Sequence, residues 1–83
     1  MTVDIKNMKK VEHNKIRANF TIVLDECITI YNCKLIYSEK KNQFYAFCPS
    51  FQYGDSYFNL VRFSDPLHSK VLDAAIIAYT QLS

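Results

Sequence analysis

The sequence has 83 residues, of which 49% are hydrophobic and 22% charged, and its net charge is +2. A chain this short holds one hydrophobic core, so residues 1–83 are expected to form a single domain, and the composition excludes a disordered protein. Its apolar runs are far shorter than the roughly 20 residues of a membrane span, and residues 1–10 lack the apolar core of a signal peptide. We therefore expect a cytoplasmic protein that has no membrane partner.

The strongest strand pattern lies in residues 15–24. Every second side chain is apolar there, which is the period of a half-buried antiparallel strand: Ile16, Ala18, Phe20, Ile22 and Leu24. A two-residue connection, Asp25 and Glu26, leads to a second strand over 27–37. Its apolar phase slips by one residue at Tyr31 and Asn32, which predicts a β-bulge. The weaker alternation and lysines of residues 2–11 indicate an edge strand before this pair.

The C-terminal half predicts two more strands and one helix. Residues 43–48 form a short aromatic strand ended by a proline, 50–56 a loop, and 57–63 another strand. Asp65 is expected as the N-cap and Pro66 as the first residue of a helix that runs to about Leu82. Ile77 lies on the polar stripe of this helix, either as an incidental exposed residue or as a subunit contact. The predicted fold is α+β, with about five antiparallel strands and one C-terminal helix packed on them.

Cysteines and aromatic residues give a second set of expectations. Cys27, Cys33 and Cys48 cannot all pair within the chain and have no Cys-x-x-Cys spacing, which indicates reduced thiols. Six Phe and six Tyr are too many large rings for a core of this size, so some should lie in a homodimer interface. The predicted interface residues are Phe44, Phe47, Phe58, Phe63 and Ile77.

Several segments resemble one known family in the same order along the chain. They are Val3-Asp4-Ile5, Ile16-Arg17-Ala18, Val23-Leu24-Asp25, Lys34-Leu35-Ile36, Phe47-Cys48-Pro49-Ser50, and Lys70-Val71-Leu72-Asp73-Ala74 with Tyr79. Together they resemble the SpoVG family of bacterial septation and sporulation regulators over nearly the whole chain. The resemblance implies a small homodimer with an antiparallel sheet and a C-terminal helix that binds DNA or RNA. Arg17 and Lys70 match basic positions of that family.

One segment departs from the family pattern. Where the family has a Lys-Arg pair after Pro-Ser, this chain continues with Phe51, Gln52, Tyr53, Gly54 and Asp55. The phosphate contacts of that loop therefore cannot be carried over to this chain. The replacement favours a rival hypothesis, a protein-interaction module that contacts its partner through Phe51 and Tyr53.

Cations suited to nucleic acid are concentrated in the first half of the chain. Residues 1–42 carry eight Lys or Arg against five Asp or Glu, whereas residues 43–83 carry two against three. A solvated polar surface would explain this charge, but a two-fold dimer duplicates every cation and can form a continuous phosphate-binding stripe. The predicted nucleic-acid-binding residues are Lys9, Lys10, Lys15, Arg17, Lys40, Lys41 and Lys70.

Catalysis finds little support in the sequence. His13 and His68 have no nucleophile or carboxylate at a recognisable spacing, and Asp25 and Glu26 point to opposite sides of an extended chain. The histidines and cysteines also lack the local spacing of metal ligands. We expect neither an enzyme nor a bound cofactor or metal.

Overall fold

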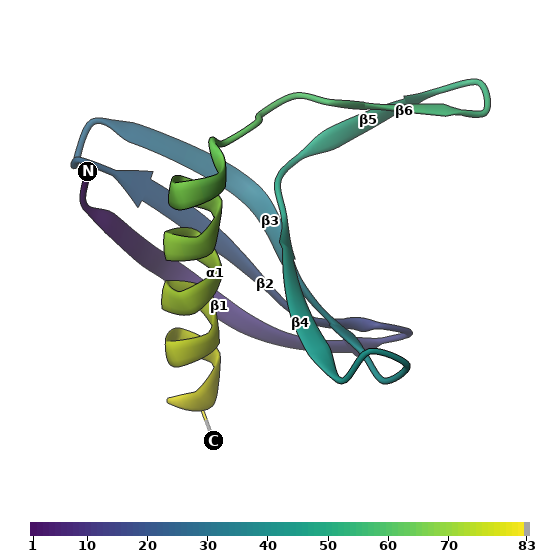
Figure 1. The fold of residues 1–83 in the computed structure, drawn as a ribbon, viewed down its shortest axis with the longest axis horizontal. Helices are drawn as coiled ribbons and strands as arrows, with labels where there is room; N and C mark the ends of the chain where they lie inside the picture. Colours follow the sequence, from purple (N-terminus) through teal and green to yellow (C-terminus); the bar gives the residue numbers. More distant parts are fainter. Residues whose placement is uncertain (83) are drawn as a thin grey trace.

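The computed structural model describes residues 1–82, without the side chains of Phe51, Gln52 and Asn59. The first four strands form one antiparallel sheet in the order β1-β2-β3-β4, and the single helix packs on one face of it (Figure 1). The α+β fold with a C-terminal helix is thus confirmed. The elements of these residues are β1 (Val3–His13), β2 (Ile16–Leu24), β3 (Ile28–Ser38), β4 (Gln43–Phe47), β5 (Ser50–Tyr53), β6 (Ser56–Asn59) and α1 (Asp65–Thr80).

Strand β2 lies inside the sheet and follows its predicted alternation. Ala18, Phe20, Ile22 and Leu24 are all buried. Strand β1 is an edge strand, as predicted, and its pairing with β2 shifts register beside Asn7, whose φ is 55°. A bulge and exposed lysines both discourage pairing of this edge with another chain.

The predicted bulge in β3 is confirmed. Phe20 pairs with Cys33 and Ile22 pairs with Ile30, so Tyr31 and Asn32 together oppose a single residue of β2. Asn32 has a φ of 60°, a left-handed conformation that asparagine tolerates better than most residues. Because the extra residue restores the apolar phase, Ile30, Cys33 and Leu35 all reach the core.

The connection between β2 and β3 is longer than predicted. It comprises residues 25–27, because β3 begins at Ile28 and leaves Cys27 in the turn. Asp25 and Glu26 both have a positive φ, 51° and 57°, and the Cys27 N–H donates to the Leu24 carbonyl oxygen at 2.9 Å. Two non-glycine residues in the left-handed region thus form the turn. The sequence did not predict this conformation, because the segment contains no glycine or asparagine.

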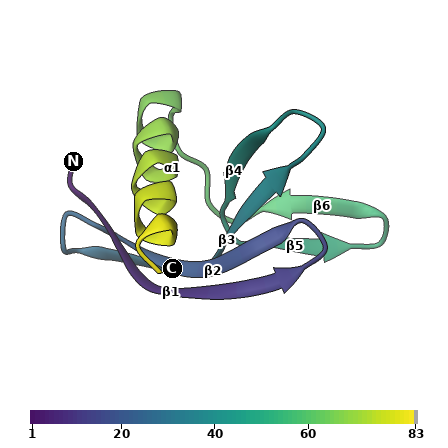
Figure 2. The same ribbon diagram turned by 90° about the horizontal axis from the view of Figure 1, so that it is seen from below.

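The expected loop over 50–56 is wrong, and only residues 57–59 of the expected strand over 57–63 lie in a strand. Strands β5 and β6 pair only with each other and form a hairpin, called here the arm. Gly54 sits at its tip with a φ of 62°, a conformation that glycine adopts at no steric cost. Figures 1 and 2 show the arm projecting away from the sheet and helix. The main sheet therefore has four strands, rather than about five.

The helix begins at Asp65, one residue before the predicted first residue, Pro66. Ser64 is the N-cap, and Asp65 and Pro66 lie in the first turn. The negative charge of Asp65 interacts favourably there with the helix dipole. The helix ends at Thr80, two residues before the predicted end. Ile77 is 58% exposed, as its place on the polar stripe predicted.

The core lies between α1 and the face of the sheet that the helix covers. Val71 and Ala75 are the buried residues of the helix. They pack against the buried side chains of the sheet, which are Ala18, Phe20, Ile22, Leu24, Ile30, Cys33, Leu35 and Ala46. The other face of the sheet, called here the open face, is not covered by α1.

Candidate functional site

Two turns that are distant in sequence lie together at one end of the sheet. Figure 1 shows the β1–β2 and β3–β4 turns at the end opposite the N-terminus. Between them is a hollow of about 200 Å³, called here the turn hollow. Three of the seven predicted cations, Lys15, Arg17 and Lys40, line it, and Lys41 belongs to the same β3–β4 turn. The remaining lining residues are Asn14, Tyr37, Ser38 and Glu39.

Arg17 is held in place at the rim of the turn hollow. Its guanidinium carbon lies 5.6 Å from the centre of the Tyr37 ring, a cation–π distance. Its Nη2 atom lies 3.8 Å from Oε1 of Glu39, whose side chain is 85% exposed. An exposed ion pair this long contributes little to stability and is easily exchanged for another anion. Arg17 is therefore oriented by an aromatic ring yet available to a phosphate.

The other predicted cations lie elsewhere on the molecule. Lys10 is on the helix side, where its Nζ lies 5.7 Å from the centre of the Tyr79 ring. Lys9 pairs with Asn19 and shares the open face with it. Nζ of Lys70 donates to the main-chain oxygen of Met1 at 2.7 Å. The structure thus brings Lys15, Arg17 and Lys40 together at the turn hollow, with Lys41 in the adjoining turn, and leaves Lys9, Lys10 and Lys70 elsewhere.

The open face carries a second cationic hollow that the predicted nucleic-acid site did not include. It measures about 500 Å³ and is called here the sheet hollow. Lys34 and Phe47, which pair directly across β3 and β4, both line it. The alternation of β3 beyond its bulge already placed Lys34 opposite to the buried Cys33 and Leu35, so a signal for its position was present. The other lining residues are Asn32, Ile36, Cys48, Pro49, Ser50 and Leu60.

Asn19 lies on the open face between two lysines. It pairs with Lys9 on one side and with Lys34 on the other. Its Oδ1 is the one buried side-chain oxygen or nitrogen without a hydrogen-bond partner among the residues that the structure describes. A buried acceptor left without a donor costs about 1–3 kcal/mol, so this position is not optimised for stability.

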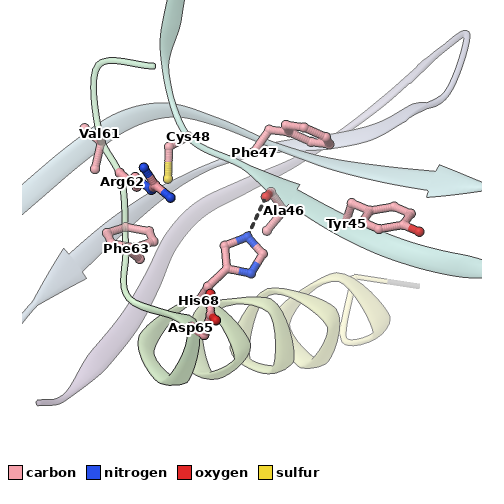
Figure 3. A pocket seen from close by; sticks show the side chains of 9 residues that line it. All are labelled: Tyr45, Ala46, Phe47, Cys48, Val61, Arg62, Phe63, Asp65 and His68. Carbon is pink, nitrogen blue, oxygen red and sulfur yellow. Dashed lines mark hydrogen bonds between the residues drawn. The ribbon is translucent and has the colours of Figure 1, made fainter. Parts of the chain in front are cut away.

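A third hollow, of about 370 Å³, lies between β4 and the start of α1 (Figure 3). Nε2 of His68 donates to the carbonyl oxygen of Ala46 at 3.2 Å and so ties the helix to the strand. Burial raises the pKa of the neighbouring Cys48 thiol, which keeps it protonated. The hydrogen bond to Ala46 thus anchors the first turn of α1 to β4.

The three cysteines are free thiols. Cys33 is fully buried, and burial raises its pKa to about 12. Cys27 is exposed in the β2–β3 turn. Within residues 1–82, no three His, Cys, Asp or Glu side chains are grouped so that they could hold a metal ion.

The residues predicted for a dimer interface fall into two groups. Phe44 packs against this chain's own Tyr37 and Tyr79, with ring centres 4.9 and 5.9 Å apart, and Phe63 packs against the core. Phe47, Phe58 and Ile77 are 51%, 50% and 58% exposed. Only this second group presents large apolar surface for a subunit contact.

No protein-family model matches the sequence, and no curated protein or solved structure is significantly similar to it. Among the described residues, no helix is both long and apolar enough to cross a membrane.

Proposed function

We propose that the protein is a small homodimeric nucleic-acid-binding regulator of the SpoVG type. The observation that carries the proposal is the turn hollow, where Lys15 and Lys40 from two separate turns and Arg17 from β2 line one cavity. Cations grouped in this way neutralise neighbouring phosphates, which is the main source of affinity for DNA and RNA. Such a regulator acts in the cytoplasm, in septation, sporulation or gene regulation.

Binding assays at several salt concentrations test this proposal. We expect measurable affinity at about 50 mM salt and a steep loss of it as salt rises, because bound phosphates release their counterions. Lys15→Ala and Arg17→Ala should each weaken binding and reduce the salt slope by about one. Arg62→Ala is the matched control, since it removes the same charge from an exposed side chain beside the start of α1, outside the turn hollow. Affinity for both DNA and RNA weaker than millimolar at the lowest salt would contradict the proposal.

The homodimer in this proposal explains the exposed apolar surface of the arm and helix. Phe58 is 50% exposed and Ile77 is 58% exposed, and a subunit contact would remove both side chains from water. A specific dimer buries about 800 Å² on each subunit. Light scattering at micromolar concentration should give twice the chain mass of 9.7 kDa, and a mass near 9.7 kDa would rule out the dimer.

The arm also favours a second function, a protein-interaction module built on the same scaffold. Tyr53 and Tyr57 are 75% and 71% exposed, which gives the arm an aromatic surface. Phe51, the other residue predicted for such a contact, has its side chain outside the described residues. Pull-down with Tyr53→Ser and Phe51→Ser separates the two functions. Lost partner capture with unchanged nucleic-acid affinity supports the module, and unchanged capture counts against it.

A further inference from the structure

The sheet hollow combines an aromatic ring and a cation on adjacent strands. Lys34 and Phe47 are directly opposite in the β3–β4 register, and the next pair on this face is Ile36 with Tyr45. Their neighbours Leu35 and Ala46 are buried beneath α1, so Lys34 and Phe47 belong to the open face. Side chains paired in this way have Cβ atoms about 5 Å apart. One ligand can therefore contact both.

The size and the lining of the sheet hollow suit a partly apolar ligand group. Its volume of about 500 Å³ is within the range of small-ligand sites. Phe47 is 51% exposed and Leu60, from the segment after the arm, is 62% exposed. An inserted base can thus cover the Phe47 ring and the Leu60 side chain. Asn32 and Ser50 add polar groups to the lining.

The charges around the sheet hollow favour a polyanion. Lys34 lines it, none of the lining residues that the structure describes is acidic, and Lys9 lies two strands away across Asn19 on the same face. A protein partner seated on Phe47 and Leu60 would have to supply a carboxylate for Lys34, whereas a nucleotide brings its phosphate with the base. The turn hollow differs in two ways. Its lining includes the acidic Glu39, and its aromatic residue, Tyr37, is only partly exposed.

From these contacts we propose that the sheet hollow binds an unpaired nucleotide of a single-stranded nucleic acid. The base stacks on Phe47, and the adjoining phosphates lie along Lys34 and Lys9. Aromatic platforms flanked by cations recognise single strands in this way, because only unpaired bases expose a face for stacking. The inference rests on the proposed nucleic-acid function, and for Phe47 it replaces the predicted subunit contact.

Fluorescence anisotropy with a short labelled oligouridylate and a duplex of the same length tests the inference. Phe47→Leu should weaken single-strand binding about tenfold, with an unchanged salt slope and unchanged duplex binding, because it keeps apolar bulk but loses the stacking ring. Phe47→Tyr should retain affinity. Lys34→Ala should reduce both affinity and the salt slope, the latter by about one. Tyr57→Leu is the control, because it removes an exposed ring from the arm, outside the sheet hollow, and it should bind as the original protein does.

The outcomes separate this inference from the proposed function. If the protein binds nucleic acid but Phe47→Leu binds single strands equally well, the inference is wrong and the proposed function stands. If neither probe binds, both are wrong. If Phe47→Leu loses binding together with a halved mass by light scattering, Phe47 is a subunit contact and the inference is again overturned. A photo-cross-link from 5-iodouridine to β4 supports it, and cross-links confined to the β1–β2 turn contradict it.

Discussion

The two faces of the four-stranded sheet use alternate residues of the same strands for different purposes. On the helix-covered face, Leu35 is fully buried among aliphatic side chains. On the open face, its neighbour Lys34 lies between Asn19 and Phe47 in the strand register. The period of two that builds a sheet allows stability and binding to be assigned to separate faces. Substitutions at adjacent positions should therefore have very different effects.

The largest expected effect comes from the helix-covered face. Leu35→Ala removes a fully buried side chain and should lower the free energy of unfolding by about 2–5 kcal/mol, through lost burial and the cavity left behind. Lys34→Ala, one residue away on the open face, should change it by less than about 0.5 kcal/mol. Urea unfolding of the two variants measures both values. Similar losses at the two positions would refute the division between the faces.

A smaller effect of opposite sign is expected on the open face itself. Asn19→Val removes the buried Oδ1 that has no hydrogen-bond partner and introduces a residue that favours strands. We expect the free energy of unfolding to rise by about 1 kcal/mol in the same urea experiment. Destabilisation would mean that the Asn19 amide has a structural role on this face.

The smallest effect concerns the end of the sheet away from the turn hollow. The Thr2 N–H donates to Oδ1 of Asp25 at 2.7 Å, and this bond lowers the pKa of the Asp25 carboxyl below its ordinary value of 3.8. A lowered pKa means that the carboxylate stabilises the fold above about pH 4 and that this contribution is lost as the pH falls through the lowered value.

Asp25→Asn should accordingly be slightly less stable than the original protein at neutral pH and equally stable at about pH 2. Glu26→Gln, which removes a charge from the same turn without touching the bond to Thr2, is the control. Thermal unfolding at the two pH values gives the comparison. An equal difference at both would show that the carboxylate charge is not what stabilises this turn.

Local patterns predicted the helix-covered face better than the rest of the molecule. The alternation of β2 and the phase slip at Tyr31 and Asn32 follow from burial on one side of a strand, which leaves a direct mark on the sequence. The strand character of residues 57–59 was predicted, but their pairing with residues 50–53 was missed, because the segment 50–56 was expected to be a loop.

The candidate site was predictable only in part. Lys15, Arg17 and Lys40 could be named as cations, but their meeting at the turn hollow depends on how the β1–β2 and β3–β4 turns are placed in space. The pairing of Lys34 with Phe47 depends on the register between two strands, and the sequence contained no marker of that register.

Mapping of backbone amide shifts during titration with a short single-stranded RNA tests the central claim most directly. At about 50 mM salt, where electrostatic binding is strong, the largest changes should occur at the open face and the turn hollow, including Lys34, Phe47 and Arg17. The buried helix residues Val71 and Ala75 should change little. Changes concentrated on α1, or no changes at millimolar RNA, would contradict the assignment of nucleic-acid binding to the open face and its adjoining turns.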